Sequence, residues 1–267
     1  MSELEQPTDA AAAAEHAAAL DRVAGELGRA RRVLFVTGAG LSADAGLPTY
    51  RGVGGLYDQG GTEDGLPIEQ ALSGETMAKR PELCWKYIAQ VERASRGARP
   101  SVGHQVIARL ERRVDEVWVL TQNVDGLHRA AGSTHVIDIH GDVHRLLCTR
   151  CDYRRTVEDY ADLAPLPRCP ECNAVVRPDV VLFGEMLPLG ELRRLQDELE
   201  LGFDVVLSVG TSSVFPYIVQ PVVIQARRGG LAVEVNPGRT VVSALVGERL
   251  PMRAAVALAE LARRLEL

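Results

Sequence analysis

The sequence lacks a hydrophobic run long enough to cross a membrane, and its first ten residues carry no basic stretch of the kind that begins a secretion signal. It also lacks an excess of basic residues, because 36 acidic residues outnumber 30 basic ones and give a net charge of −6. A direct nucleic-acid binder is expected to show the opposite balance. We therefore expect no membrane insertion and no direct binding of DNA or RNA, and we expect a cytoplasmic protein.

Cysteine is also scarce, and four of the five cysteines form two Cys-x-x-Cys pairs separated by 17 residues. Cys148, Cys151, Cys169 and Cys172 have the spacing of a tetrahedral zinc site in which each of two loops supplies two thiolates. Disulfide pairing is the alternative, but nothing in the chain suggests secretion. Four thiolates leave no open position for water, so the expected zinc is structural. The fifth cysteine, Cys84, is expected to be a small buried apolar residue.

Short, continuous apolar runs recur along the chain and are typical of strands buried on both faces of a parallel sheet. These runs are residues 33–36, 117–120, 136–139, 205–209 and 231–235. Helical patterns separate most of them, including His104 to Arg113 and Leu189 to Leu201. The alternation predicts an α/β fold with a doubly wound, Rossmann-like parallel sheet. A helix is predicted from about Glu15 to Arg29, after a flexible tail over residues 1–14.

Two insertions interrupt this pattern. The first, residues 53–97, begins in a glycine-rich stretch (52–65) expected to be a mobile loop and continues as helices. The second, residues 142–177, holds the paired cysteines and predicts a small zinc-ribbon module. We expect residues 15–267 to form a single catalytic domain. Its predicted large lobe comprises about 15–52, 98–141 and 178–267, and its small lobe comprises the two insertions.

The first apolar run ends in a glycine-rich turn, Gly38-Ala39-Gly40-Leu41-Ser42-Ala43. Glycines let the backbone pass close to a pyrophosphate, and a following helix N-terminus offers free N–H groups. The turn therefore predicts nucleotide binding, with a tight turn that binds no ligand as the alternative. A dehydrogenase also needs an acidic residue about 20 positions further on. A glycine-rich loop occupies that stretch, which weakens a hydride-transfer function.

The other apolar runs also end in polar or glycine-rich clusters, at the edge where doubly wound folds bind their ligands. The clusters are Thr121-Gln122-Asn123-Val124-Asp125, His140-Gly141, Gly210-Thr211-Ser212-Ser213 and Asn236-Pro237. A histidine at such an edge can act as a general base near neutral pH. Taken singly, His140 is equally compatible with a structural role. Together, the five strand ends predict one ligand site.

From about residue 20 to the C-terminus, the chain resembles the sirtuins, which are NAD-dependent protein lysine deacylases. The order and spacing of several motifs carry the resemblance. The matching segments are residues 38–42, 49–51, 121–125, 140–141, the four paired cysteines, and residues 181–185, 210–212 and 235–236. The resemblance implies NAD as a consumed co-substrate, structural Zn²⁺, and acyl-lysine proteins or peptides as partners.

The resemblance assigns NAD contacts to residues at four of the five strand ends and to residues 49–51. They are Gly38, Ala39, Gly40, Ser42, Thr49, Tyr50, Arg51, Gln122, Asn123, Asp125, Gly210, Thr211, Ser212 and Asn236. Tyr50 is implied to shield the reactive ribose carbon, Arg51 to order the loop over NAD, and Asp125 to bond the nicotinamide carboxamide. Residues 246–249 are expected to approach the adenine.

His140 and Asn123 are the implied catalytic residues, with His140 as the general base. In the implied reaction, the acyl oxygen attacks the ribose carbon, nicotinamide leaves, and a ribose hydroxyl deprotonated by His140 attacks the resulting imidate. Val181, Phe183, Gly184 and Glu185 are implied to bind the substrate peptide as an added strand, with Phe183 along the acyl-lysine tunnel. A mono-ADP-ribosyltransferase or a catalytically weak NAD sensor uses the same site, so both remain alternatives.

Two features depart from the family pattern. Sirtuins that remove dicarboxylic acyl groups carry Tyr-x-x-Arg on the tunnel helix, whereas Ile88 and Val91 occupy those places here. Succinyl-lysine is therefore an expected poor substrate, because a buried unpaired carboxylate is costly. Acetyl or a longer apolar acyl group is favoured. The loop from Gly210 to Pro216 is one residue shorter than the usual form and flanks the expected peptide groove.

Overall fold

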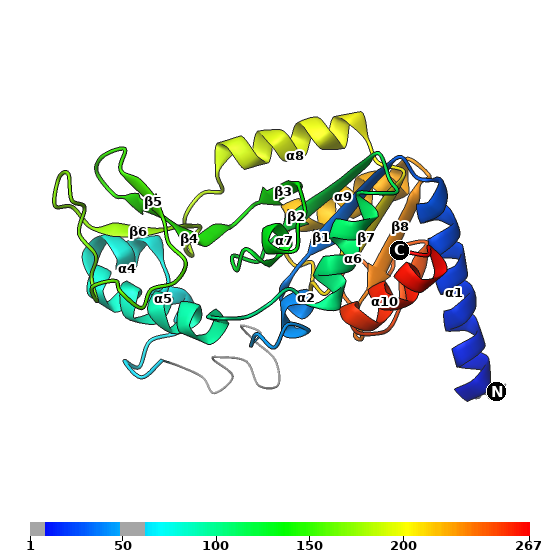
Figure 1. Cartoon of the computed structure of the whole chain (residues 1–267), viewed down its shortest axis with the longest axis horizontal. Helices are drawn as coiled ribbons and strands as arrows, with labels where there is room; N and C mark the ends of the chain where they lie inside the picture. The colour runs from blue at the N-terminus through cyan, green and yellow to red at the C-terminus, as the bar shows by residue number, and fades with distance from the viewer. Residues whose placement is uncertain (1–8, 49–61) are drawn as a thin grey trace, which may run out of the picture.

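The computed structural model describes residues 9–48 and 62–267, and its larger lobe is built on one six-stranded parallel sheet (Figure 1). The strand order is β3-β2-β1-β7-β8-β9. The strands are β1 (Arg32–Thr37), β2 (Glu116–Thr121), β3 (His135–Asp138), β7 (Val205–Val209), β8 (Leu231–Val235) and β9 (Glu248–Leu250). The order reverses at β1, so the ends of β1, β2 and β7 meet at the edge where such sheets bind ligands. The predicted doubly wound sheet is confirmed.

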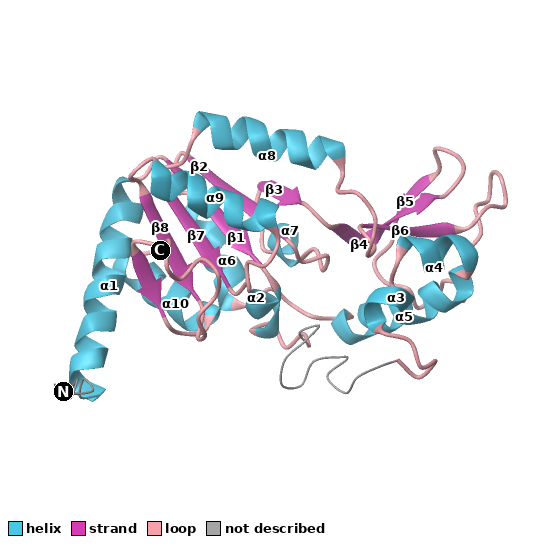
Figure 2. Cartoon of the chain, turned by 180° about the vertical axis from the view of Figure 1, so that it is seen from behind, coloured by secondary structure: helices cyan, strands magenta, loops and turns pink. Residues whose placement is uncertain are grey.

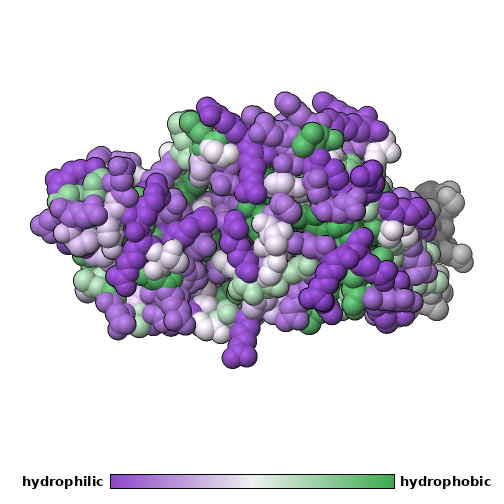
Figure 3. Space-filling view, turned by 45° about the horizontal axis from the view of Figure 1, so that its top comes forward, coloured by the Kyte–Doolittle hydropathy of each residue, from purple (hydrophilic) through white to green (hydrophobic). Residues whose placement is uncertain are grey.

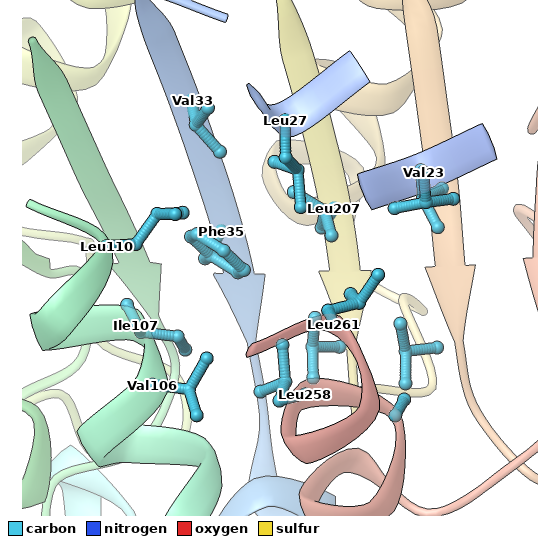
Figure 4. Close-up of a cluster of buried hydrophobic side chains, with 14 of the residues drawn as sticks. Val23, Leu27, Val33, Phe35, Val106, Ile107, Leu110, Leu207, Leu258 and Leu261 are labelled. Atoms are coloured by element: carbon cyan, nitrogen blue, oxygen red, sulfur yellow. The ribbon is translucent and has the colours of Figure 1, made fainter. Parts of the chain in front are cut away.

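Alternate residues of β1 belong to cores on opposite faces of the sheet. Val33 and Phe35 share a core with α1 (Asp9–Arg29), α6 (Val102–Leu110) and α10 (Ala254–Arg264), as Figure 4 shows. Leu34 and Val36 share the opposite core with α8 (Leu189–Leu201) and α9 (Pro216–Arg227), which Figure 2 shows from behind. Because both faces are covered, these strands require continuous apolar runs rather than alternation.

Two helices differ from their predicted bounds. α1 begins at Asp9, so residues 9–14 belong to the helix rather than to the predicted tail. The reason is the alanine run, since alanine has the highest helix propensity. α6 spans Val102–Leu110 instead of 104–113. It begins earlier than predicted because Ser101 and His104 form a capping box at its start. The three-residue strand β9 was not predicted, since so short a segment carries no usable pattern.

The two inserted segments pack together as the smaller lobe. The first supplies α3 (Ile68–Ala71), α4 (Gly74–Lys79) and α5 (Pro81–Ser95), and the second supplies an antiparallel sheet of β4 (Gly141–Cys148), β5 (Arg154–Thr156) and β6 (Val176–Val180). Their shared core is centred on Trp85, whose indole N–H donates to the Val176 carbonyl at 2.9 Å and whose ring lies 5.5 Å from that of Tyr160. Cys84 is fully buried in this core, as predicted.

None of the helices in the described part of the chain has the length and apolar character needed to cross a bilayer. The face drawn in Figure 3 is mostly hydrophilic, and its hydrophobic residues form small, separate patches. Scattered hydrophobic side chains of this kind are ordinary on a protein surface. The predicted glycine-rich loop at 52–65 lies largely outside the described residues.

Candidate active site and metal centre

The turn after β1 lies directly against the turn after β7. Gly38 caps the short helix α2 (Ala39–Ala43), and the Gly40 N–H donates to the Gly210 carbonyl at 2.8 Å. A Cβ on Gly40 would lie 2.8 Å from both the Cα and the carbonyl oxygen of Gly210. Gly210 itself has a φ of +60°. Both positions therefore require glycine, one for the close approach and the other for its backbone conformation.

These two turns and the loop after β8 line an open cavity of about 370 Å³. Its lining is Gly40, Ala43, Asp44, Gly210, Thr211, Ser212, Asn236, Pro237, Arg239, Thr240, Arg253 and Ala254. The Asn236 amide donates to the Thr211 carbonyl at 3.0 Å and joins the loop to the turn. Five of the predicted NAD-binding residues thus line one cavity.

Several lining residues were missed by the sequence reasoning. Arg253 donates to the buried Asp44 carboxylate at 2.6 and 2.9 Å, and Arg239 adds a second positive charge to the lining. No motif marks them, because Arg239 lies in the loop after β8 and Arg253 follows β9, the short strand that was not predicted. The segment expected near adenine, 246–249, does not line the cavity. There, Arg249 pairs with Glu234 at 2.9 Å and donates to the Gly238 carbonyl at 2.5 Å in the loop after β8.

A hydrogen-bonded group joins the end of β2 to the first turn. The Ser42 hydroxyl donates to the Asp125 carboxylate at 2.6 Å, and the Asn123 amide donates to Ser42 Oγ at 2.9 Å. The same amide also reaches the Gly38 carbonyl at 3.0 Å. On the other side, the Gln122 amide donates to Thr211 Oγ1 at 2.8 Å. The predicted residues of three strand ends therefore form one connected polar network.

His140 follows β3, and its two ring nitrogens have different partners. Nδ1 lies 3.0 Å from the Gln122 carbonyl, which can only accept, so Nδ1 carries the proton. Nε2 lies 2.7 Å from the hydroxyl of Tyr217, in the first turn of α9. Burial lowers the pKa of His140, against the opposing effect of the Gln122 bond. The ring is therefore neutral near pH 7, with Nε2 as its proton acceptor, which is the state that a general base requires.

The four paired cysteines converge in the smaller lobe. All four Sγ atoms lie within 4.8 Å of one another, with Cys148–Cys172 and Cys151–Cys169 separations of 3.5 Å. A disulfide requires about 2.05 Å between its sulfurs, whereas a tetrahedral zinc site with bonds of about 2.3 Å places them about 3.8 Å apart. All four are free cysteines. The donor set fits structural zinc and not disulfides.

Comparison with known proteins identifies the family. The model of the Sir2 family matches residues 38–216, a span that includes the first glycine turn, His140 and all four paired cysteines. The chain belongs to the Sir2 family.

Relatives and solved structures of this family match most of the chain. The NAD-dependent protein deacylase 2 of Pseudomonas aeruginosa is 51% identical over 235 residues, 87% of this chain and 91% of that protein. A solved Sir2 homolog–NAD complex is 35% identical with a TM-score of 0.82, covering 92% of this chain and 93% of that one. A Sir2 variant solved with deacetylated p53 peptide and 3'-O-acetyl ADP ribose is 29% identical, with a TM-score of 0.80 over 91% and 97%.

In this Sir2-family chain, residues 181–185 form a turn after β6 rather than a strand. The Val181 N–H donates to the His140 carbonyl at 2.9 Å, and both the N–H and the carbonyl of Phe183 bond to the smaller lobe. Glu185 accepts from Arg177 at 2.5 and 3.0 Å and so braces the turn. A peptide strand added here must pair with the remaining backbone groups. The other predicted loop residues, Thr49, Tyr50 and Arg51, lie outside the described residues.

Two buried histidines lie beside the end of β1. Nε2 of His128 is 2.9 Å from the Thr37 hydroxyl, and the rings of His104 and His128 are 4.8 Å apart. Within the described residues, His104 Nε2 and His128 Nδ1 have no hydrogen-bond partner. Burial lowers the pKa of His104, against the opposing charges of Asp125 and Asp44. Burial lowers the pKa of His128 further, and His104 adds to that effect. Both rings are therefore neutral in the folded Sir2-family chain.

We expect the folded state to lose stability as the pH falls below about 6.5. The folded state keeps these two imidazoles neutral, whereas the unfolded state takes up protons below that pH, so acid favours unfolding. Each histidine contributes up to about 1.4 kcal/mol per pH unit between its unfolded and folded pKa. Urea titrations at about pH 7.5 and about pH 5.5 measure the loss.

The matched comparison for this pH effect is a double variant, His104→Gln with His128→Asn, whose stability is expected to change less between the two pH values. His135→Asn, at the first residue of β3, is the control, and its stability should change with pH as that of the wild type does. An equal pH-dependent loss in the wild type and the double variant contradicts the assignment to this pair.

Proposed function

We propose that this chain is an NAD-dependent protein lysine deacylase, most simply a deacetylase. It consumes NAD and water and releases free lysine, nicotinamide and O-acyl-ADP-ribose. The observation that carries the proposal is the neutral His140 at the sheet edge where the two glycine turns and the polar network converge. The names of the relatives, and the NAD and acetyl-ADP-ribose in the neighbouring structures, support it.

Each group of residues has a distinct task in this reaction. Backbone N–H groups of the paired turns hold the diphosphate of NAD, as helix N-termini and glycine turns do elsewhere. Asp125 accepts from the nicotinamide carboxamide, which replaces its bond to Ser42. After the acyl oxygen has displaced nicotinamide from the ribose, His140 draws a proton from a ribose hydroxyl toward Nε2. The freed oxygen attacks the imidate carbon, and hydrolysis releases the lysine.

The substrate is an acyl-lysine protein or peptide that docks along residues 181–185. Phe183 is 43% exposed there, as a side chain that borders a peptide groove should be. Gly184 and Glu185 shape the turn beside it, since Gly184 has a φ of +81° and Glu185 is held by Arg177. We also assign the enzyme to the cytoplasm, because thiolate zinc sites persist in reducing compartments.

Acyl preference follows from the tunnel helix α5. Ile88 is 4% exposed within the smaller lobe's core, and Val91 packs against that core, so neither offers a charge to a second carboxylate. We expect acetyl-lysine to be turned over at least about tenfold faster than succinyl-lysine, because burying an unpaired carboxylate costs at least about 1.4 kcal/mol. Competing the two peptides in one reaction measures the ratio, and a ratio near one contradicts the proposal.

Product identity tests the proposed function. Purified protein is incubated with NAD and an acetyl-lysine peptide, and all products are resolved by mass. Deacetylated peptide together with O-acetyl-ADP-ribose supports the deacylase. ADP-ribosylated protein with an intact acetyl group supports the mono-ADP-ribosyltransferase instead. NAD-dependent thermal stabilisation with no turnover of any acyl peptide supports the NAD sensor.

The contact between the two turns predicts the effect of Gly40→Ala. Its new Cβ must push Gly210 away, which we expect to weaken NAD binding at least about tenfold and to cost about 1–3 kcal/mol of stability. Calorimetric NAD titration and urea unfolding measure the two effects. Gly25→Ala is the matched control, because its Cβ meets only the end of the Arg29 side chain at 3.8 Å in an ordinary helix. Wild-type NAD affinity in Gly40→Ala contradicts the role of the turn.

A further inference from the structure

The lone pair of the proposed base already has a partner. An imidazole nitrogen that carries no proton has a single in-plane lone pair, and the Tyr217 hydroxyl lies 2.7 Å from Nε2 of His140. Because Nδ1 donates to the Gln122 carbonyl, the Tyr217 hydroxyl must be the donor in this second bond. A ribose hydroxyl therefore cannot bond directly to Nε2 while Tyr217 stays in place. It can bond to the Tyr217 oxygen, which still has lone pairs to accept a proton.

The Tyr217 ring is held by its surroundings. It stacks on Phe215 with ring centroids 5.5 Å apart and an angle of 12°, and His140 meets the Tyr217 ring edge-on at 5.9 Å and 81°. Phe215 caps α9, and Pro216 occupies the first helical position. Ile218, the residue after Tyr217, is fully buried in the core that Leu34 and Val36 share with α8 and α9. The hydroxyl is thus carried by the anchored first turn of a helix rather than by a loose loop.

The phenol is also in the protonation state that donation requires. Burial raises the pKa of Tyr217 to about 12, so the hydroxyl keeps its proton at neutral pH. The shortened loop between Gly210 and Pro216 ends at this helix start, which links the departure seen in the sequence to the placement of Tyr217.

We propose that Tyr217 relays the proton between the ribose hydroxyl and His140, an inference that rests on the proposed deacylase function. The ribose O–H bond breaks, and its proton passes to the Tyr217 oxygen while the Tyr217 hydroxyl proton passes to Nε2. The ribose oxygen forms a bond to the imidate carbon, and the π electrons of that carbon–nitrogen bond move to nitrogen. Tyr217 ends neutral, and His140 ends as an imidazolium whose Nε2–H donates back to Tyr217. Tyr217 is thereby a catalytic residue of this chain.

Tyr217→Phe tests the relay, because it removes one hydroxyl and keeps the stacked ring. Two rates are measured on the same protein: exchange of labelled nicotinamide into NAD in the presence of acetyl peptide, and formation of O-acetyl-ADP-ribose. The relay acts after nicotinamide has left. We therefore expect exchange to stay near the wild-type rate while product formation falls about 10²-fold, the low end of general-base effects. Tyr153→Phe, in the loop between β4 and β5 of the smaller lobe, is the matched control and should change neither rate.

Each other outcome overturns the relay. Unchanged or faster product formation in Tyr217→Phe shows that the hydroxyl is displaced when substrates bind. If Tyr217→Phe loses both nicotinamide exchange and product formation, the residue acts before the base or maintains the structure of the site. If the wild type itself shows neither exchange nor product, the deacylase proposal fails as well, and that result is separate from the first two.

Discussion

His140→Ala is expected to lower deacetylation turnover by about 10²–10⁴-fold, the range that a positioned general base supplies. His140 is neutral and oriented by the Gln122 carbonyl, so its loss removes the proton acceptor and leaves the cavity lining unchanged. NAD binding and zinc content should therefore persist. Steady-state product formation with saturating NAD and acetyl peptide measures the effect, and exchange of labelled nicotinamide should survive because it precedes the step that needs the base.

The matched control is His135→Ala, which removes the same side chain from the opposite end of β3. His135 packs against the Trp118 ring at 4.9 Å, so this variant carries a comparable loss of packing without touching the site. It should retain wild-type turnover. Wild-type turnover in His140→Ala contradicts the assignment of the base, and loss of NAD binding in that variant makes the residue structural instead.

Removing the zinc is expected to unfold the small sheet and abolish turnover. The free energy of metal binding is folding free energy in such modules, and a loss of about 5 kcal/mol corresponds to about 10–20 °C in unfolding temperature for a domain of this size. β4 runs from Gly141, the residue after the base, to Cys148, the first zinc ligand. Because β4 joins the two, unfolding of the module is expected to displace His140 from its position in the site. Cys169→Ala should purify without zinc, unfold at a lower temperature and show no turnover.

Cys84→Ala is the control for that variant, because Cys84 is equally buried but lies outside the sulfur cluster. It should keep one zinc per chain and most of its activity, with only the small cost of a cavity. Metal content by elemental analysis and thermal unfolding read out both variants independently of activity. Chelation that removes zinc and leaves activity and thermal stability unchanged contradicts the coupling.

The sheet and most of its ligand edge could be predicted from the sequence because burial on both faces leaves a distinctive pattern. The runs at 205–209 and 231–235 match β7 and β8 residue for residue, and α8 also has its predicted bounds. Parallel strands place their carboxyl ends on one edge, so polar clusters far apart in sequence were expected to meet. The bonds among Ser42, Asn123 and Asp125 confirm that convergence.

Contacts made through helices and loops could not be predicted in this way. The bond between Tyr217 and His140 depends on where α9 begins and how its first turn is rotated, which no periodicity encodes. Arg253 and Asp44 meet at the cavity from positions more than 200 residues apart. Arg253 follows the three-residue strand β9, which carries no usable pattern, and Asp44 follows the short helix α2. Residues 181–185 were expected to pair with a substrate peptide. The sequence did not indicate that the backbone N–H and carbonyl of Phe183 already bond to the smaller lobe, because those bonds depend on how that lobe packs.

The most direct measurement of the central claim is the stoichiometry of a single reaction with NAD and an acetyl-lysine peptide, followed by mass. We expect one nicotinamide and one O-acetyl-ADP-ribose for each lysine freed, with no lysine freed when NAD is left out. Free lysine that appears without NAD, or nicotinamide release with no acetyl-ADP-ribose, contradicts the assignment of this site as an NAD-consuming deacylase.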